Sequence, residues 1–454
     1  MSIKSVNPYN NQKWKEYTAL SAQGLLNEVQ TSFDAYQSWK RTTFEERTEL
    51  MHQCASQLQK DKEHLASLIT LEMGKIITES HAEIDKCSLV CQYYADNAKS
   101  QLSDEPLHVS NGQAYIHFNS IGPVLAIMPW NFPFWQVFRF AAPNLMVGNT
   151  GILKHASNVP QCAIAIEETF MKAGFPKGVF TTLLIGSEQV NSIIENKNVA
   201  AVTLTGSEEA GSSVASHAGK NLKKVVLELG GSDPFIVLRD ANLKLAAETA
   251  VKARMINCGQ SCIAAKRFII AEQVYDKFLG YFSDRLNSMN YGDPSNPYTT
   301  LGPLASIKLA KELHQQVRES LKSGAKLLYG ELPKEINSAM FFPIILGDIP
   351  QNCPAYDEEL FGPVACFFKV KNEQEAIELA NNSQFGLGAS VWTENNDLGE
   401  KVAYEIESGA VYVNKMMASD PSVPFGGVKR SGFGRELSKL GIKEFANQKT
   451  IWVA

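Results

Sequence analysis

The sequence lacks the cysteine and histidine patterns that mark disulfide-rich proteins and zinc sites. Its eight cysteines form no C-x-x-C pair, and its eight histidines form neither H-x-x-H nor H-E-x-x-H. Cys87 and Cys91 are four residues apart, so they share one face of a helix and are interpreted as core lining. We therefore expect neither a disulfide framework nor a bound metal.

The sequence also lacks an excess of positive charge and any long apolar run. Its formal net charge is −5, whereas a protein that binds nucleic acid needs a basic surface for the phosphates. No apolar run approaches the ~20 residues that a membrane-spanning helix requires. The N-terminal residues have neither the signal-peptide pattern nor the Arg-rich pattern of targeting sequences. We expect no nucleic-acid partner, no membrane partner and a cytoplasmic location.

The chain is long enough for more than one domain, and it begins with helices. At 454 residues it exceeds what one hydrophobic core usually supports. Residues 1–12 are polar and are expected to form a short irregular arm. Periodic apolar residues then predict four helices up to about residue 98. One of these helices opens with a capping box of Thr43 and Glu46, and another ends at Gly74.

Beyond these helices, short apolar strands alternate with helices. Strands are expected at 114–118, 124–128, 151–153, 178–184 and 200–204, with helices at 161–173 and 189–195. A second series starts at Val225 and ends near Val413. This alternation is typical of parallel, doubly wound sheets, so the predicted fold class is α/β with two such domains. The tail from Lys449 to Val453 alternates like a strand and needs a partner strand in the same or another subunit.

Cys262 is the candidate nucleophile. It lies in a GQSC turn with small neighbours, which leave room for a substrate carbon to approach the sulfur. A thiol is nucleophilic only as the thiolate, and the pKa of a free cysteine is roughly 8.5, so a positive local field is needed. The alternative is that Cys262 is a small buried hydrophobe, as most free cysteines are.

Two further candidates follow strand ends, where open α/β sheets bind ligands. Glu228 ends an apolar strand, and partial desolvation there would raise its pKa and suit it to accepting protons near neutral pH. The alternative is a capping or salt-bridged carboxylate. Asn131, in MPWNFPFW, has a side-chain amide that can donate to a developing oxyanion, and its alternative role is to form a turn.

Six motifs occur in the order in which one enzyme family has them. They are PWNFP, TLTGS, LELGG, GQSC, EELFGPV and PFGGVKRSGFGRE, and the similarity extends from about residue 31 to the end. The interval between Glu228 and Cys262 is also the one that this family shows between its base and its nucleophile. The sequence resembles the aldehyde dehydrogenase superfamily and is closest to the succinate-semialdehyde dehydrogenase type.

The resemblance implies a reaction, the NAD(P)-dependent oxidation of succinate semialdehyde to succinate. Cys262 would attack the aldehyde carbon, and Asn131 with the backbone N–H of Cys262 would hold the oxyanion. Hydride transfer to the cofactor would leave a thioester, and Glu228 would activate the water that hydrolyses it. The alternative is a broad-specificity aldehyde dehydrogenase that acts on other small aliphatic aldehydes.

The resemblance also implies a division of the chain. Residues 1–99 and 121–229 would form a Rossmann-like dinucleotide-binding domain, 230–430 the catalytic domain, and 100–120 with 431–454 a small β oligomerisation element. That element would pair the strand near residue 115 with the C-terminal strand in a homodimer or homotetramer.

A cofactor site is implied as well, although it does not follow the G-x-G-x-x-G fingerprint. The helix after the strand AAVTLT would present its N-terminal N–H groups to the pyrophosphate. Lys154 would bind the adenine-side ribose, and Glu359 the nicotinamide-side ribose. The expected cofactor residues are Trp130, Lys154, Ser157, Gly206, Ser207, Gly211, Glu359 and Phe361.

Ser157 predicts the choice of cofactor. NAD-selective relatives often have Glu at this position, three residues after the strand-end Lys154, where the carboxylate repels a 2′-phosphate. Serine removes that charge and adds a hydrogen-bond donor, so we expect NADP to be preferred and NAD to be used less well. Ser157 is also placed to cap the helix that begins near Pro160, and the two roles are compatible.

Arg139 predicts the choice of substrate. It lies four residues after Trp135 on one helix face, among apolar neighbours, where a charge needs a partner. Succinate-semialdehyde-type relatives have Arg at this position, so the guanidinium is expected to bind the substrate carboxylate, with a hydrogen bond added by Ser419. The alternative is a fixed structural salt bridge, which would favour the broad-specificity enzyme.

Overall fold

The N-terminal residues form a hairpin. The computed structural model describes residues 2–454, so Met1 lies outside the described part. Strand β1 (Ser2–Asn7) pairs antiparallel with β2 (Gln12–Thr18), and Ile3 and Ser5 are buried in alternation along β1. The expectation of an irregular arm was wrong, because a hairpin of mostly polar residues leaves little apolar alternation in the sequence.

Four helices follow, as predicted. They are α1 (Ala22–Trp39), α2 (Phe44–Lys60), α3 (Lys62–Met73) and α4 (Ile77–Gln101). The capping box of Thr43 and Glu46 is present at the start of α2, and Gly74 ends α3 with a φ of 79°, a left-handed conformation that favours glycine. Cys87 and Cys91 are both fully buried on α4, which confirms their place in the core.

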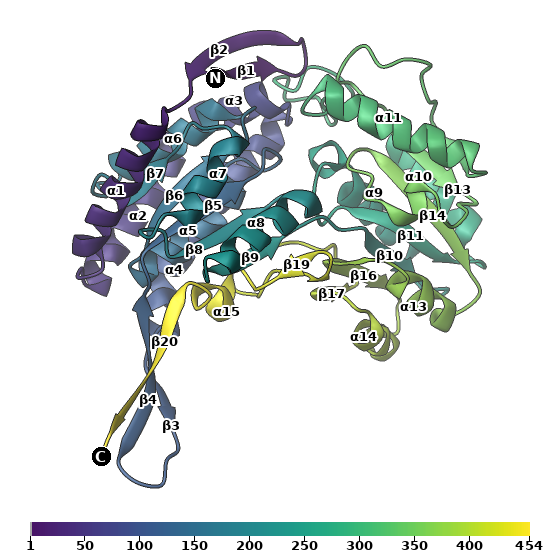
Figure 1. The fold of residues 1–454 in the computed structure, drawn as a ribbon. Coiled ribbons are helices and arrows are strands. Elements are labelled where there is room, and N and C mark those ends of the chain that lie inside the picture. The colour runs from purple at the N-terminus through teal and green to yellow at the C-terminus, as the bar shows by residue number, and fades with distance from the viewer. Residues whose placement is uncertain (1) are drawn as a thin grey trace.

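A six-stranded sheet forms the first α/β layer (Figure 1), in the order β19-β9-β8-β5-β6-β7. Its strands are β5 (Pro123–Met128), β6 (Thr150–His155), β7 (Phe180–Thr182), β8 (Ala201–Thr205), β9 (Lys224–Glu228) and β19 (Gly432–Phe433). The helices between them are α5 (Trp135–Val147), α6 (Pro160–Lys172), η1 (Ser187–Gln189), α7 (Val190–Glu195) and α8 (Glu208–Lys220). The chain runs outward from β5 to β7 and returns to β8 on the other side of β5. A topological switch point therefore lies between β5 and β8, which is where such sheets bind ligands.

A seven-stranded sheet forms the second α/β layer, in the order β12-β13-β14-β11-β10-β16-β17. Its strands are β10 (Asp233–Val237), β11 (Ala265–Ala271), β12 (Lys326–Tyr329), β13 (Ile344–Gly347), β14 (Val364–Val370), β16 (Gly388–Trp392) and β17 (Ala410–Val413). The helices are α9 (Leu243–Met255), η2 (Ile256–Gly259), α10 (Tyr275–Asn287), α11 (Ile307–Lys322), α12 (Pro354–Asp357), α13 (Glu373–Asn381) and α14 (Asn396–Glu405). The pairs within this sheet are parallel except that of β12 with β13. Two doubly wound sheets confirm the predicted fold class.

A small antiparallel sheet projects from the first layer (Figure 1). It consists of β3 (Glu105–Leu107), β4 (Gln113–Ser120) and β20 (Ala446–Val453), and β20 pairs with β4 along its whole length. The predicted C-terminal strand thus finds the strand near residue 115 within its own chain. Trp452 and Val453 remain 55% and 58% exposed at the end of β20.

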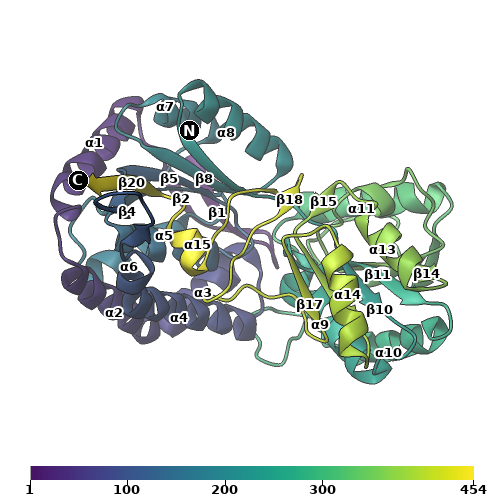
Figure 2. The same cartoon turned by 90° about the horizontal axis from the view of Figure 1, so that it is seen from below.

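The C-terminal segment returns from the second sheet to the first (Figure 2). Strand β18 (Val428–Lys429) pairs with β15 (Phe385–Gly386), β19 then joins β9, and α15 (Ser438–Ile442) contacts α4 and α5. Only β20 of the last 24 residues belongs to the projecting sheet.

The first sheet packs against two hydrophobic clusters and the second sheet against a third, and the site lies where the larger cluster of the first sheet (the first core) approaches that of the second (the second core). Phe138 and Phe170 belong to the first core, and Phe268 and Phe282 to the second. Cys262 packs with the first core, although the residues just before and after its loop belong to the second. No helix within residues 2–454 has the length and apolarity to cross a membrane.

Candidate active site

The loop that carries Cys262 has an unusual backbone. Asn257, Cys258 and Gly259 are consecutive left-handed residues, with φ of 52°, 54° and 74°. A non-glycine residue in this region costs about 1–3 kcal/mol and persists only where its surroundings fix it. Here Asn257 Nδ2 donates a 2.7 Å hydrogen bond to the carbonyl of Asn131. The loop of the second domain is therefore tied to a strand end of the first.

Asn131 follows β5 and makes a return contact with the same loop. Its Nδ2 donates a 3.2 Å hydrogen bond to the Gln260 carbonyl, and its side chain is buried. An amide nitrogen carries two N–H groups, so one of them stays available to a ligand. Asn131 thus has the free donor that oxyanion binding requires.

Glu228 is the last residue of β9, between Thr205 of β8 and Gly432 of β19. Its side chain is 2% exposed, and burial raises the pKa of its carboxyl, while the nearby Arg139 guanidinium lowers it. Its Oε1 has no hydrogen-bond partner among residues 2–454. A buried carboxyl with a raised pKa and a free oxygen is suited to accept a proton near neutral pH.

The electrostatic surroundings of Cys262 keep its thiol protonated at rest. Burial raises its pKa well above the usual value, and the Glu228 carboxyl raises it further, while Arg139 and Lys266 lower it. The positive field expected from the sequence is present, but it does not outweigh the other two effects. The thiol must therefore lose its proton as it reacts, and Glu228 is the neighbouring carboxyl that can accept it.

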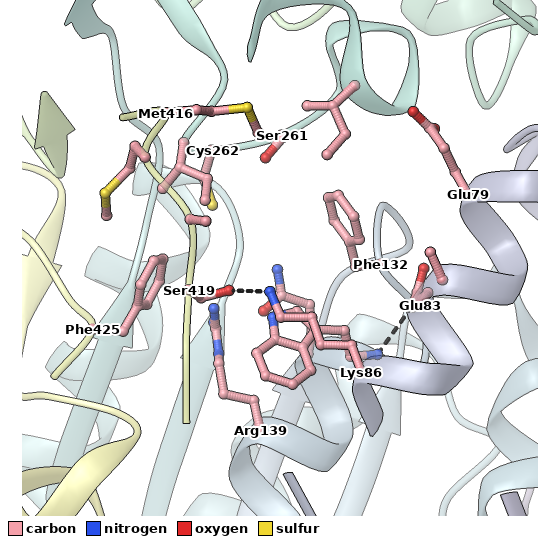
Figure 3. A pocket seen from close by; sticks show the side chains of 17 residues that line it. Glu79, Glu83, Lys86, Phe132, Arg139, Ser261, Cys262, Met416, Ser419 and Phe425 are labelled. Atoms are coloured by element: carbon pink, nitrogen blue, oxygen red, sulfur yellow. Dashed lines mark hydrogen bonds between the residues drawn. The ribbon is translucent and has the colours of Figure 1, made fainter. Parts of the chain in front are cut away.

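Cys262 borders two cavities. Asn131 and Glu228 line the first, and Arg139 and Ser419 line the second. Figure 3 shows the second cavity, with Cys262 on one side of it and Arg139 on the opposite side. The structure thus brings the three predicted catalytic residues to one space, with Cys262 reachable from both cavities. Sequence reasoning placed all three correctly at the ends of their strands and loop.

Arg139, on α5, is engaged by two carboxylates. Its Nη2 lies 2.7 Å from Oε2 of Glu436 and donates a 3.3 Å hydrogen bond to Oε2 of Glu228. Burial raises the pKa of Glu436 to about 7, and Arg139 opposes that shift. The ion pairs correspond to the salt-bridge alternative, yet Arg139 also lines the second cavity. Its contact with a substrate carboxylate stays a prediction.

The first cavity opens at the switch point between β5 and β8. Gly206 leads into α8, whose N-cap Ser207 accepts a hydrogen bond from the backbone of Ala210. The rings of Trp130 and Phe361 meet edge to face with centroids 5.8 Å apart. The expected cofactor residues that line this cavity are Trp130, Gly206, Ser207, Glu359 and Phe361.

Lys266 holds Glu359 beside the nucleophile loop, and the sequence did not single it out. Its Nζ lies 3.0 Å from Oε1 of Glu359 and donates to the carbonyls of Ser261 and Cys262 at 2.9 and 2.8 Å. A Cβ on Gly230 would collide with the Glu359 carboxylate, so the glycine gives that side chain its place. The buried ammonium of Lys266 therefore links Glu359, which is expected to bind the ribose, to the loop of Cys262.

Three expected cofactor residues lie outside the lining of the first cavity. Lys154 is near the end of β6, where burial lowers its pKa, and Gly211 lies against Leu229 inside α8. Ser157 is exposed, and the N-cap of α6 is Val159, which has no side-chain hydrogen bond. The alternative that Ser157 caps this helix is therefore wrong, and its hydroxyl stays available to a ligand.

These residues fit a bound dinucleotide. The cavity at the switch point provides the backbone N–H groups of the start of α8, two aromatic rings and the Glu359 carboxylate. The first turn of α8 also contains Glu208, whose charge would oppose a pyrophosphate, but an ion pair with Arg430 offsets it. The exposed hydroxyl of Ser157 is three residues from Lys154 in a loop that continues β6.

Sequence reasoning missed two charged residues: Lys86, which lines the second cavity, and Glu436, the ion-pair partner of Arg139. Glu436 lies in the motif PFGGVKRSGFGRE, so its place in that motif could have drawn attention to it. Lys86 lies on α4, and its Nζ donates a 2.7 Å hydrogen bond to Oγ of Ser419, 333 positions along the chain. Nothing local marks Lys86, since it is one polar residue among many on a long helix.

Comparisons with known proteins agree with this geometry. A model of the aldehyde dehydrogenase family matches residues 1–451. The chain is 48% identical to a protein of Synechocystis sp. named probable succinate-semialdehyde dehydrogenase (NADP(+)), and 45% identical to succinate-semialdehyde dehydrogenase (NADP(+)) 1 of Mycobacterium ulcerans, with 100% of each chain covered. It superimposes with a TM-score of 0.97 and 40% identity on succinic semialdehyde dehydrogenase from Streptococcus pyogenes in complex with NADP+, and the match covers 99% of each chain. The chain belongs to the aldehyde dehydrogenase family.

Proposed function

We propose that the protein is an NADP-preferring succinate-semialdehyde dehydrogenase, which oxidises succinate semialdehyde to succinate. The observation that carries the proposal is the position of Cys262 between two cavities, one at the switch point of the first sheet and one with basic side chains in its wall. The names of the relatives in Synechocystis sp. and Mycobacterium ulcerans support the same substrate and cofactor.

The first chemical step forms a bond from sulfur to carbon. As the Cys262 thiol passes its proton to Glu228, the sulfur attacks the aldehyde carbon and the carbonyl oxygen becomes an oxyanion. The free N–H of Asn131 and the backbone N–H of Cys262 stabilise that charge. The Asn131 donor is fixed before the substrate arrives, because its Nδ2 is tied to the carbonyl of Gln260.

NADP, when bound, would supply the hydride acceptor. Trp130, Phe361 and Glu359 would orient its nicotinamide end, and the start of α8 would bind its pyrophosphate. The hydroxyl of Ser157 and the ammonium of Lys154 would bind the 2′-phosphate and the adjacent ribose, since no carboxylate stands at position 157 to repel the phosphate.

The last chemical step is hydrolysis of the thioester on Cys262. Glu228 first releases to solvent the proton that it took from Cys262. It then removes a proton from water, and its raised pKa makes it a stronger base than an exposed glutamate. The ion pair with Arg139 keeps this carboxylate at its place in the buried site. Hydroxide then displaces the sulfur, which takes back a proton, and the acid is released.

One observation favours the broad-specificity alternative. Arg139 already forms ion pairs with two carboxylates, Glu228 and Glu436, before any substrate binds. The absorbance of reduced cofactor, measured with succinate semialdehyde and with butanal, each with NAD and NADP, separates the two functions. We expect kcat/KM to be highest for succinate semialdehyde with NADP. Equal values for the two aldehydes would favour the broad-specificity enzyme.

We also infer that the chain forms a homodimer or homotetramer through its projecting sheet. Trp452 and Val453 expose apolar surface at the end of β20, and the far edge of β20 has no partner strand among residues 2–454. Sedimentation of the whole chain and of a chain truncated after Lys449 tests this. Loss of the oligomer on truncation is the expected result.

A further inference from the structure

The ammonium of Lys266 lies beside the loop that carries Cys262 and is surrounded by oxygen atoms. Lys266 is near the start of β11, and its side chain is buried against the turn that precedes this strand. Its Nζ donates to the carbonyls of Ser261, Cys262 and Ala264 at 2.9, 2.8 and 3.2 Å. An ammonium has three N–H donors, so these carbonyls use all of them, while Oε1 of Glu359 supplies the countercharge from 3.0 Å.

The carbonyl of Ser261 is held from two sides. It accepts a hydrogen bond from Nζ of Lys266 at 2.9 Å and another from the backbone N–H of Ala264 at 3.1 Å. A carbonyl oxygen has two lone pairs, so both are occupied. The peptide unit that joins Ser261 to Cys262 is planar and trans, with its N–H opposite its carbonyl. Whatever fixes the Ser261 oxygen therefore also fixes the direction of the Cys262 N–H.

The N–H of Cys262 itself donates to no acceptor within residues 2–454. Buried backbone N–H groups are almost always paired, and Cys262 is only 8% exposed. This residue lines both cavities, and Asn131, whose amide keeps one N–H free, lines the first of them with it. An oxygen of a ligand bound at the sulfur is therefore the partner for which the Cys262 N–H is available.

We propose that Lys266 is a positioning residue for the reaction, which orients and polarises the Ser261–Cys262 peptide so that its N–H binds the oxyanion. A hydrogen bond to a carbonyl draws electron density from the nitrogen of the same peptide, which makes its N–H a stronger donor. A charged donor has a larger effect than a neutral one. The donors of Lys266 are already used, so Lys266 acts through the peptide. This inference rests on the proposed function, because it takes the attack of Cys262 on a carbonyl carbon as the first step.

Two other effects of Lys266 have to be separated from this one. Burial and the Glu228 carboxyl raise the pKa of the Cys262 thiol, and the charge of Lys266 lowers it. The ion pair with Glu359 also holds an expected ligand of the cofactor in place. The first effect changes the reactivity of the thiol toward every electrophile, and the second matters only when a cofactor binds. Polarisation of the peptide, by contrast, acts only on reactions that form an oxyanion.

Two reagents separate these effects without a cofactor. With para-nitrophenyl acetate, the sulfur of Cys262 attacks the ester carbon, the thiol proton passes to Glu228, and the carbonyl electron pair moves to oxygen. The oxyanion then expels para-nitrophenolate and leaves an acetyl thioester on Cys262. Iodoacetamide alkylates the same sulfur by direct displacement of iodide, and the thiol loses its proton without any oxyanion being formed.

The quantity measured is the ratio of the second-order rate constants for acylation and for alkylation of Cys262 in the full-length chain. Both reactions are followed at the same pH, so the extent of thiol deprotonation affects both rates and cancels in the ratio. Mass spectrometry of the peptide that contains Cys262 assigns each modification to this residue.

In Lys266→Met, which removes the charge and the donors but keeps the size of the side chain, we expect the ratio to fall about tenfold. Loss of a whole oxyanion donor costs about 10²–10³-fold, and here the donor is weakened but not removed. Lys266→Gln keeps a neutral N–H donor, so its ratio should lie between the other two, and it carries the comparison if the methionine variant does not fold. Lys369→Met is the matched control, because Lys369 is an exposed lysine on β14, the strand that pairs with β11, and its loss should leave the ratio unchanged.

An unchanged ratio in the Lys266 variants would overturn the assignment, because the lysine would then act only on the thiol or on the packing of the loop. The assignment would also fail if Cys262 of the unaltered chain were alkylated but not acylated. Neither reagent is an aldehyde, so the result does not depend on which aldehyde is the substrate. The proposed function fails separately, through an unaltered chain that does not prefer succinate semialdehyde to butanal.

Discussion

Arg139 donates a 3.3 Å hydrogen bond to Glu228, inside the core and within reach of the second cavity. The residue expected to select the substrate therefore also holds the carboxylate expected to act as base. Glu436 lies on the same guanidinium nitrogen, so the three side chains form one buried charged group. A substitution of Arg139 should therefore change kcat through Glu228 as well as KM through substrate binding.

Arg139→Met should lower kcat for both succinate semialdehyde and butanal by about tenfold or more, because Glu228 loses its hydrogen-bond partner. The pH dependence of kcat shows in which direction the pKa of Glu228 changes. Arg139 lowers the pKa of Glu228, so its removal raises that pKa further. The acidic limb of the kcat profile should then move to higher pH, since the base must be ionised to act.

One outcome would contradict this prediction for Arg139. If Arg139→Met raised KM for succinate semialdehyde and left butanal oxidation and its pH profile untouched, the guanidinium would be the main carboxylate ligand. Gln136→Met is a suitable comparison, because Gln136 lines the same cavity on the same helix, and within residues 2–454 it forms no side-chain hydrogen bond with Glu228.

Ser157→Glu should reverse the choice of cofactor. The exposed loop after β6 can accept the larger side chain, and a carboxylate there would repel the 2′-phosphate and accept hydrogen bonds from ribose hydroxyls. We expect kcat/KM for NADP to fall roughly a hundredfold, while that for NAD is kept or improved. Initial rates with varied cofactor measure this. Ser157→Ala is the control, and an unchanged NADP preference in Ser157→Glu would mean that the 2′-phosphate binds elsewhere.

Glu228→Gln should stop turnover after acylation. The amide cannot accept a proton, so hydrolysis should slow about 10²–10⁴-fold. The attack of Cys262 also loses its proton acceptor, but it should slow less, because the charge of Glu228 no longer raises the pKa of the thiol. Stopped-flow absorbance should show up to one equivalent of reduced cofactor per active site, followed by a stall. Mass spectrometry should then find the acyl group on Cys262. Steady turnover at the unaltered rate would exclude Glu228 as the base.

The sequence could predict those parts of the site whose position is set by neighbouring residues in the chain. Glu228 ends an apolar strand and Asn131 follows another. The carboxyl ends of parallel strands converge, so the strand pattern of the sequence already brings these side chains together. Gly74 and the capping box at Thr43 similarly mark helix ends through backbone geometry that only a few residue types provide.

The remaining parts depend on contacts between distant segments. The partners of Arg139 lie 89 positions away, at Glu228, and farther still, at Glu436, so no window of sequence shows that its charge is committed. The contact of Lys86 with Ser419 has the same character. The N-terminal hairpin was missed for a different reason, since only Ile3 and a few neighbours are buried along it.

The strained loop before Cys262 yields a final prediction, about stability. Gly259 has a φ of 74°, and a Cβ there would collide with the Gly362 carbonyl, so Gly259→Ala adds both backbone strain and a clash. We expect a loss of about 2–5 kcal/mol, seen as a Tm lowered by several degrees, together with reduced activity because the loop carries the nucleophile. Gly219→Ala is the matched control. Gly219 lies within α8 with open space at its Cβ, so alanine there should stabilise by up to about 1 kcal/mol. If the two variants had the same Tm and full activity, the left-handed turn would not be what holds Cys262 in place.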